Sequence, residues 1–265
     1  MATNTKGSCI DGPPYDLICV GFGPASLSIA TALHDGRINA RVLFIEKQKK
    51  FAWHSGMMLP GTRMQISFMK DMATFRDPRS KFTFLSYLQA KGRLAAFSNL
   101  GTFYPLREEF NDYLAWVSSH FAEYVNYGED VVSVTPPATT GTVKEWNISS
   151  VNVVTGAVSN YSAKNVVIAI GGAAKIPAEF APKLYNTRVI HSSTFAHNTP
   201  VILPNRDAPY NIAVVGGGQS AVEIYVELQN RYPNSKTTLF IRQAALKPSD
   251  DSPLYVLRST AVSRA

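Results

Sequence analysis

Short apolar runs, each followed by glycines and then by apolar residues at helical spacing, occur twice along the chain. The first set consists of a strand, a helix and a strand, predicted at 15–20, 24–34 and 41–46. The second set repeats this order, with strand, helix and strand predicted at 211–215, 219–230 and 236–242. Each set predicts a β-α-β unit, in which a right-handed crossover joins two parallel strands.

The residues between the two sets predict a different arrangement. A loop-rich segment dense in Met, Phe, Trp and Gly extends from Lys47 to about Arg79, and loops of this length are usually functional when they are this aromatic. Two helices are expected after it, at 81–91 with Ser80 as the cap and at 107–121.

A run of strands follows these helices. Alternating apolar residues predict strands at 127–134, 146–154 and 164–170, and Thr155 and Gly156 predict a turn. We therefore expect the chain to leave a parallel sheet, form an antiparallel meander and return to the sheet. Five prolines between Pro177 and Pro209 predict a connecting region before the second β-α-β unit.

The composition is that of a globular protein and argues against several classes. The 265 residues are 45% hydrophobic and 17% charged, which suits one large domain or two modest ones. No apolar run is long enough to predict a membrane span or a secretory signal. The two cysteines, Cys9 and Cys19, do not form a disulfide framework, so we expect a reducing, cytoplasmic location. The net charge of +7 comes from scattered Lys and Arg, which argues against nucleic-acid binding.

The first glycine turn has the spacing that binds a dinucleotide. Gly21 allows a tight turn, Gly23 lets the backbone approach a pyrophosphate, and the small Ser26 lets helix and strand pack closely. The bare N–H groups and the dipole of the following helix favour phosphate. Glu46 ends the next strand, where its carboxylate can accept hydrogen bonds from ribose hydroxyls. The alternative is that these glycines serve packing alone.

The second glycine turn differs from the first in the residue that ends the next strand. Gly216 and Gly218 precede the predicted helix, and Arg242 stands where the first unit has its acid. Arginine forms charge-assisted hydrogen bonds with a ribose 2′-phosphate, so we expect NADPH rather than NADH, unless Arg242 is simply a solvated strand end. The pair of sites predicts FAD as a retained cofactor and NADPH as the hydride donor.

Several segments carry a resemblance to a known family. They are EKQKKFAWHSGMMLPGTRMQISFMKDMATFRDPRSKFTFLSYL at Glu46–Leu88, GFGPASL, KNVVIAIGG, YNIAVVGGGQSAVEIYVELQNRYPNS and KPSDDSP. Together they resemble the fungal-type L-ornithine N5-monooxygenases, the flavin-dependent N-hydroxylases of siderophore biosynthesis, over Tyr15 to Pro253. The resemblance implies an α/β fold with two Rossmann-like units, in which an NADPH domain is inserted into an FAD domain. It also implies an NADPH-dependent oxidoreductase that uses O₂ to convert L-ornithine into N5-hydroxyornithine for hydroxamate siderophores.

The resemblance assigns binding residues position by position. The residues implied for FAD are Gly21, Gly23, Ser26, Glu46, Lys47, Gln48, Lys49, Lys50, Phe51, Ala52, Trp53, His54, Gln65 and Val131. Those implied for NADPH are Gly217, Gly218, Gln219, Ser220 and Arg242. Lys70 would pair with the ornithine carboxylate, and no metal or protein nucleophile is implied. Without the resemblance, Lys70 would be a solvated charge and Trp53 and His54 ordinary packing residues.

The resemblance ends after KPSDDSP, whereas members of the family continue further. The expected parts are a disordered tail at 1–14, the N-terminal part of an FAD domain at 15–205, the first β-α-β of an NADPH domain at 206–253 and a divergent tail at 254–265. We expect such an incomplete chain to be weakly active or inactive. Two alternatives stay open: a flavin monooxygenase acting on lysine or another amine, and a non-catalytic nucleotide-binding fragment. The resemblance also implies a homotetramer.

Overall fold

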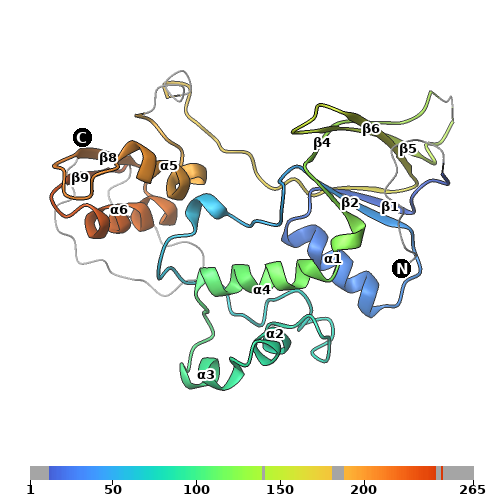
Figure 1. The fold of residues 1–265 in the computed structure, drawn as a ribbon, viewed down its shortest axis with the longest axis horizontal. Coiled ribbons are helices and arrows are strands. Elements are labelled where there is room, and N and C mark those ends of the chain that lie inside the picture. The colour runs from blue at the N-terminus through green and yellow to red at the C-terminus, as the bar shows by residue number, and fades with distance from the viewer. Residues whose placement is uncertain (1–11, 139–140, 181–187, 243–245, 247–265) are drawn as a thin grey trace. The chain divides into compact units, whose positions relative to one another are not determined.

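The computed structural model describes residues 12–138, 141–180, 188–242 and 246, and these form two compact units (Figure 1). Unit 1 consists of the described residues of Met1–Trp53, Ile66–Pro105 and Glu109–Gly172. Unit 2 consists of those of His54–Gln65, Leu106–Glu108 and Ala173–Ala265. The division between the units therefore does not follow the expected boundary at residue 205. Apart from residues 12–14, the two expected tails lie outside the described residues.

Unit 1 contains the parallel sheet of the first β-α-β unit. Its strands, in the order β3-β2-β1-β7, are β1 (Leu17–Val20), β2 (Val42–Glu46), β3 (Val125–Tyr127) and β7 (Val166–Ile168). The helix α1 (Pro24–Asp35) connects β1 to β2 along the chain (Figure 1). The predicted strand–helix–strand unit is confirmed, because these bounds agree with the predicted ones to within a few residues.

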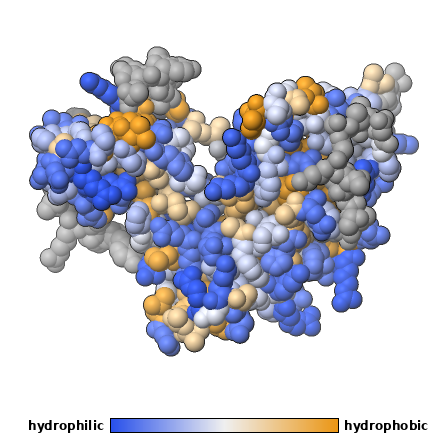
Figure 2. Space-filling view, in the orientation of Figure 1, coloured by the Kyte–Doolittle hydropathy of each residue, from blue (hydrophilic) through white to orange (hydrophobic). Residues whose placement is uncertain are grey.

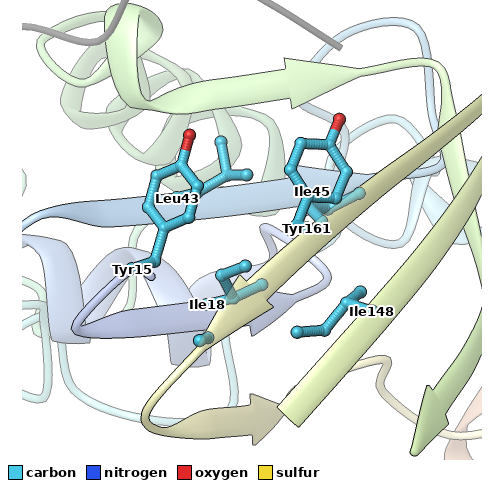
Figure 3. Packing of buried hydrophobic residues seen from close by; sticks show 7 residues of the cluster. Tyr15, Ile18, Leu43, Ile45, Ile148 and Tyr161 are labelled. Atoms are coloured by element: carbon cyan, nitrogen blue, oxygen red, sulfur yellow. The ribbon is translucent and has the colours of Figure 1, made fainter. Parts of the chain in front are cut away.

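The meander predicted between the helices and β7 is present, but its third strand, at residues 158–163, was not predicted. It forms a separate antiparallel sheet of β4 (Glu129–Thr135), β5 (Trp146–Asn152) and β6 (Val158–Ala163). The side chains of Ile18, Leu43 and Ile45 on the parallel strands pack against Ile148 and Tyr161 on this second sheet (Figure 3). These residues are at least nine-tenths buried, so their contact stabilises the pairing of the two sheets.

Both predicted helices are present, whereas the cap of the first differs from the prediction and a further short helix was not predicted. The helices are α2 (Phe84–Ala90), α3 (Leu94–Asn99) and α4 (Arg107–Ser119). The helix α4 is the one predicted at 107–121, whereas α3 was not predicted. The prediction that Ser80 caps α2 is wrong. Thr83 is the N-cap, and its hydroxyl accepts a hydrogen bond from Ser86 N at 3.1 Å. The Ser80 hydroxyl instead accepts one from Phe82 N at 3.1 Å.

Some apolar side chains of unit 1 reach the surface. Leu100 and Phe103, which follow α3, are 62% and 57% exposed, and hydrophobic residues are visible there among hydrophilic ones (Figure 2). Scattered exposed apolar residues are normal for a folded protein. Among the described residues, helices of the length and apolarity needed to cross a membrane are absent.

Unit 2 contains the second predicted β-α-β unit. The parallel strands β8 (Asn211–Val215) and β9 (Lys236–Phe240) are joined by α6 (Gln219–Arg231), and α5 (Phe195–Ile202) precedes them. The core of this unit brings together Leu59, Phe195, Val214, Ile224, Leu228, Tyr232 and Leu239. Leu59 comes from the long aromatic loop, which therefore supplies part of a hydrophobic core.

Cys19 on β1 gives a prediction about thiol reactivity. The residue is completely buried, and burial raises the pKa of its thiol to about 11, so only about one thiol in 1,000 would be ionised near pH 8. In a Cys9→Ser variant, we expect the native chain to resist a colourimetric disulfide reagent near pH 8. The same sample unfolded in guanidinium should react with one thiol per chain. Fast reaction of the native protein would contradict the burial of Cys19.

Candidate dinucleotide-binding sites

The first glycine turn is held tightly at one glycine and is open at the next. Gly21 has a φ of +92°, and a Cβ added there would lie 2.5 Å from the carbonyl oxygen of Ala169. Gly23 has an extended backbone, and a Cβ added there would meet no atom within 4 Å. Gly21 is therefore required by the turn itself, whereas the chain at Gly23 leaves room for another group. Ser26, also predicted here, lies fully buried on α1.

The start of α1 fits the pyrophosphate of a dinucleotide. Gly23 is its N-cap and provides no side-chain hydrogen bond, and Pro24 occupies the first helical position. Pro24–Asp35, all of which the structure describes, has no acidic residue in its first turn. The first N–H groups and the positive end of the helix dipole therefore favour an anion.

Glu46 is joined to the first glycine turn. It ends β2 and is 8% exposed; one carboxylate oxygen accepts a hydrogen bond from Phe22 N at 2.7 Å and the other accepts one from Gln48 N at 2.8 Å. The carboxylate thus fixes the glycine turn against the segment that follows β2. Each oxygen keeps a second lone pair, which could accept a hydrogen bond from a ribose hydroxyl. This role of Glu46 stays a prediction.

We expect Glu46→Ala to destabilise unit 1 by about 2–4 kcal/mol, because it leaves two backbone N–H groups without their charged acceptor. Glu46→Gln should also destabilise unit 1, because its oxygen can accept from one of the two groups while its NH₂ faces the other N–H, and two donors cannot pair. Chemical denaturation measures both, with Glu108→Gln as a control because Glu108 is exposed. Equal stability of Glu46→Ala and the wild type would show that the two hydrogen bonds contribute little.

The predicted FAD residues after Glu46 lie mostly near the surface of unit 1. Lys47 forms an ion pair with Asp130 at 2.7 Å, and the Gln48 side chain donates to Ala52 O at 3.2 Å. Lys49 and Lys50 are exposed. The ring of Phe51 contacts Phe22 edge to face, with the centroids 6.5 Å apart, so this segment lies beside the glycine turn.

The remaining residues predicted for FAD belong to different parts of the structure. Trp53 is partly buried against Phe110, with ring centroids 6.0 Å apart, and Val131 is partly buried on β4. His54 and Gln65 are exposed and belong to unit 2. His54 has a left-handed backbone, with a φ of 46°. Thus the structure brings the glycine turn, Glu46 and the segment up to Ala52 together, and it places His54 and Gln65 in the other unit.

Lys70 is exposed, which agrees with the alternative of a solvated charge and leaves its role toward the ornithine carboxylate a prediction. The residue next to it forms an unpredicted local network. One oxygen of Asp71 accepts from Ala73 N and Thr74 N at 3.0 and 2.6 Å, and the other accepts from the Thr74 hydroxyl and Phe84 N at 2.7 and 2.6 Å. Asp71 therefore fixes the turn that follows Lys70. The acid directly after this lysine was the available signal in the sequence.

The second glycine turn is built in the same way as the first. Gly216 has a φ of +143° and donates its N–H to Phe240 O at 2.9 Å. Gly218 is the N-cap of α6, with no side-chain cap and no atom within 4 Å of an added Cβ. A Cβ on Gly217 would make only an ordinary contact, 3.7 Å from Ile241. The described first turn of α6 contains no acid, so it too fits a phosphate group.

The side chains around the second turn differ in how they are held. Arg242 and Ser220 are exposed, and Arg242 stands two residues beyond Phe240, where β9 ends earlier than predicted. Gln219 donates to Glu223 at 2.8 Å, and Arg107 forms a bidentate pair with the same carboxylate at 2.9 and 3.0 Å. The contribution of Arg107 and Glu223 was not predicted, although Gln219 and Glu223 have the i,i+4 spacing of helix neighbours.

Two glycine turns of this kind, each opening an uncapped helix within a β-α-β unit, define an α/β protein of the class that binds two dinucleotides. The family model of L-lysine 6-monooxygenase/L-ornithine 5-monooxygenase matches residues 13–261, and the chain belongs to this family. This match continues past Pro253, where the sequence alone placed the end of the resemblance.

Individual relatives agree with this family. The chain is 52% identical over 254 residues to the L-ornithine N(5)-monooxygenase of Emericella nidulans, covering 90% of this chain and 50% of the relative. Among solved structures it is similar to the ornithine hydroxylase PvdA from Pseudomonas aeruginosa, with a TM-score of 0.84 and 39% identity, over 91% of this chain and 58% of that one. It is also similar to the ornithine N-hydroxylase KtzI of Kutzneria sp. 744, solved with reduced FAD, NADP⁺ and L-ornithine (TM-score 0.82, 35% identity, 91% and 56% covered). The chain spans about half the length of the curated relatives it matches.

Proposed function

We propose that this chain is part of an FAD- and NADPH-dependent monooxygenase that hydroxylates the side-chain amine of L-ornithine for hydroxamate siderophores. The observation that carries the proposal is the pair of open glycine turns, one followed by Glu46 at the end of β2 and the other by Arg242 after β9. The names of the relatives support ornithine as the substrate, and the ligands of KtzI support FAD and NADPH as the cofactors.

The described residues fit these two cofactors. The start of α1 would hold the FAD pyrophosphate, with Glu46 and the segment up to Ala52 beside it. The start of α6 would hold the NADPH phosphates, and the exposed guanidinium of Arg242 is available to a 2′-phosphate. FAD supplies the oxygen chemistry when it is bound and reduced by NADPH.

The substrate role belongs to Lys70. Its exposed ammonium can pair with the carboxylate of ornithine, and the turn fixed by Asp71 limits the movement of the backbone beside it. Orientation of the substrate by such a pair lowers the entropic cost of reaction. A homotetramer, which rests on the resemblance to the family, and a cytoplasmic location, which rests on the cysteine content, complete the proposal.

The direct test is to purify the chain, measure the binding of FAD and of NADPH separately, and then measure NADPH oxidation and hydroxyornithine formation with both cofactors, L-ornithine and O₂ present. We expect the wild type to retain flavin. We expect Gly23→Ala to keep its stability to within about 1 kcal/mol but to lose flavin, because its methyl group would occupy the open space before α1. A wild-type chain that folds but binds neither nucleotide would contradict the proposal. Hydroxylation of L-lysine in place of L-ornithine would support the alternative substrate.

A further inference from the structure

A chain of four polar groups ends at the second glycine turn. The guanidinium of Arg107 donates to Met57 O at 3.1 Å and forms its bidentate pair with Glu223. Glu223 in turn accepts a hydrogen bond from the side-chain amide of Gln219, the first residue of α6. Arg107 and Glu223 are 13% and 17% exposed, so this network is largely shielded from water, and all four residues belong to unit 2.

The network determines which end of the Gln219 amide is available. Its NH₂ group is used by the carboxylate of Glu223, because a flipped amide would place its carbonyl oxygen against a carboxylate oxygen. The carbonyl oxygen of Gln219 therefore points away from Glu223. A carbonyl oxygen only accepts hydrogen bonds, so this end of the side chain suits a hydroxyl or an amide N–H and not a phosphate oxygen.

Arg107 also changes the electrostatics of the second turn. Glu223 lies one helical turn after the start of α6, and an unpaired carboxylate there would oppose a bound phosphate. The bidentate pair with Arg107 offsets this charge and limits the rotamers of the Glu223 side chain. Without Arg107, Glu223 would be free to rotate and the Gln219 amide would lose its fixed orientation.

We propose that Arg107, acting through Glu223, is a positioning residue that holds the carbonyl oxygen of Gln219 ready to accept a hydrogen bond from an uncharged donor of the nicotinamide nucleotide. This donor is a ribose hydroxyl or the carboxamide, and the phosphates are left to the backbone N–H groups of the turn and to Arg242. The inference rests on the proposed function of the second turn as an NADPH site. It extends that function by naming the residues that orient the side chain and the kind of group it recognises.

The test is calorimetric titration of the full chain with NADP⁺. We expect Gln219→Leu and Arg107→Met each to weaken binding about tenfold, the effect of losing one hydrogen bond. Because both changes act on the Gln219 contact, the loss in the double variant should be smaller than the sum of the two single losses. Any loss beyond that of Gln219→Leu comes from the unpaired charge of Glu223. Arg231→Met is the matched control, since it removes a different arginine–glutamate pair, with Glu227, from the same helix. Its affinity should equal that of the wild type.

A second titration uses a truncated ligand that keeps only the phosphorylated adenosine half of NADP⁺. If this ligand also binds more weakly to Gln219→Leu, the donor is in the adenosine half, and if its affinity is unchanged, the donor is in the nicotinamide half; either result supports the proposal. Unchanged NADP⁺ affinity of Gln219→Leu would overturn it, as would a full additional loss in the double variant. Arg107→Lys, which keeps the charge but not the bidentate geometry, replaces Arg107→Met if that variant does not fold. A wild-type chain that binds no NADP⁺ would instead overturn the proposed site together with the inference.

Discussion

In a Gly56→Ala variant, the hydrophobic core of unit 2 is expected to open. Gly56 lies in the short 3₁₀ helix Ser55–Met57, and an added Cβ would stand 1.8 Å from the carbonyl oxygen of Ser193 and 2.8 Å from Thr194 N. Both atoms belong to the backbone, so relief requires movement of a whole segment rather than of one side chain. We expect a loss of at least about 3 kcal/mol, a large part of the about 5–15 kcal/mol that usually stabilises a protein.

Hydrogen exchange measured by mass spectrometry would locate this effect. Peptides from β8, α6 and β9 should exchange faster in Gly56→Ala, because their core includes Leu59, three residues after the substitution. Gly217→Ala is the control, since its Cβ would lie at an ordinary distance of 3.7 Å from Ile241. If Gly56→Ala matched the wild type in exchange, the close approach of residues 56 and 193 would be absent in solution.

The second large effect is expected for Gly21→Ala, and it concerns unit 1. The residue has a φ of +92°, which costs about 1–2 kcal/mol for any other L-residue. Its Cβ would also lie 2.5 Å from the carbonyl oxygen of Ala169 and 3.0 Å from the carbon of the same group. Together these effects should destabilise unit 1 by about 3 kcal/mol or more, so the protein would lose its fold there before any question of nucleotide binding arises.

Tryptophan fluorescence during urea unfolding would measure this change. The three tryptophans, Trp53, Trp116 and Trp146, all belong to unit 1. Gly21→Ala should therefore shift the fluorescence transition to lower urea, whereas Gly56→Ala should mainly change hydrogen exchange in unit 2. Gly172→Ala is the control, because its Cβ would meet no atom within 4 Å. A fluorescence transition of Gly21→Ala at the wild-type urea concentration would contradict the strained turn.

The regular elements could be predicted because their side chains repeat with the period of a strand or a helix. The helices α1 and α6 and their flanking strands follow apolar runs that glycines separate. The cap of α2 was placed wrongly, because Ser80 and Thr83 are both plausible caps and only the tertiary structure decides between them. No periodic pattern in the sequence predicted that residues 54–65 belong to unit 2, because this depends on contacts with residues much later in the chain.

The parts of the candidate sites that are formed by backbone could be predicted from the sequence. The parts that are formed by side chains were harder to predict. The open positions at Gly23 and Gly218 follow from the glycine spacing. The double hydrogen bond of Glu46 to the backbone could not be inferred from its position at the end of a strand. Likewise, Arg107 lies 116 residues before Glu223, and no local pattern connects residues so far apart.

The burial of Leu59 in the core of unit 2 has a consequence for the nascent protein. Its partners Val214, Ile224 and Leu239 are translated about 155–180 residues later, and ribosomes add about 5–20 residues per second. The loop around Leu59 therefore leaves the ribosome on the order of ten seconds before the residues that it packs against have been synthesised. During that interval its apolar side chains are open to chaperones, and folding of unit 2 has to wait until β9 has emerged.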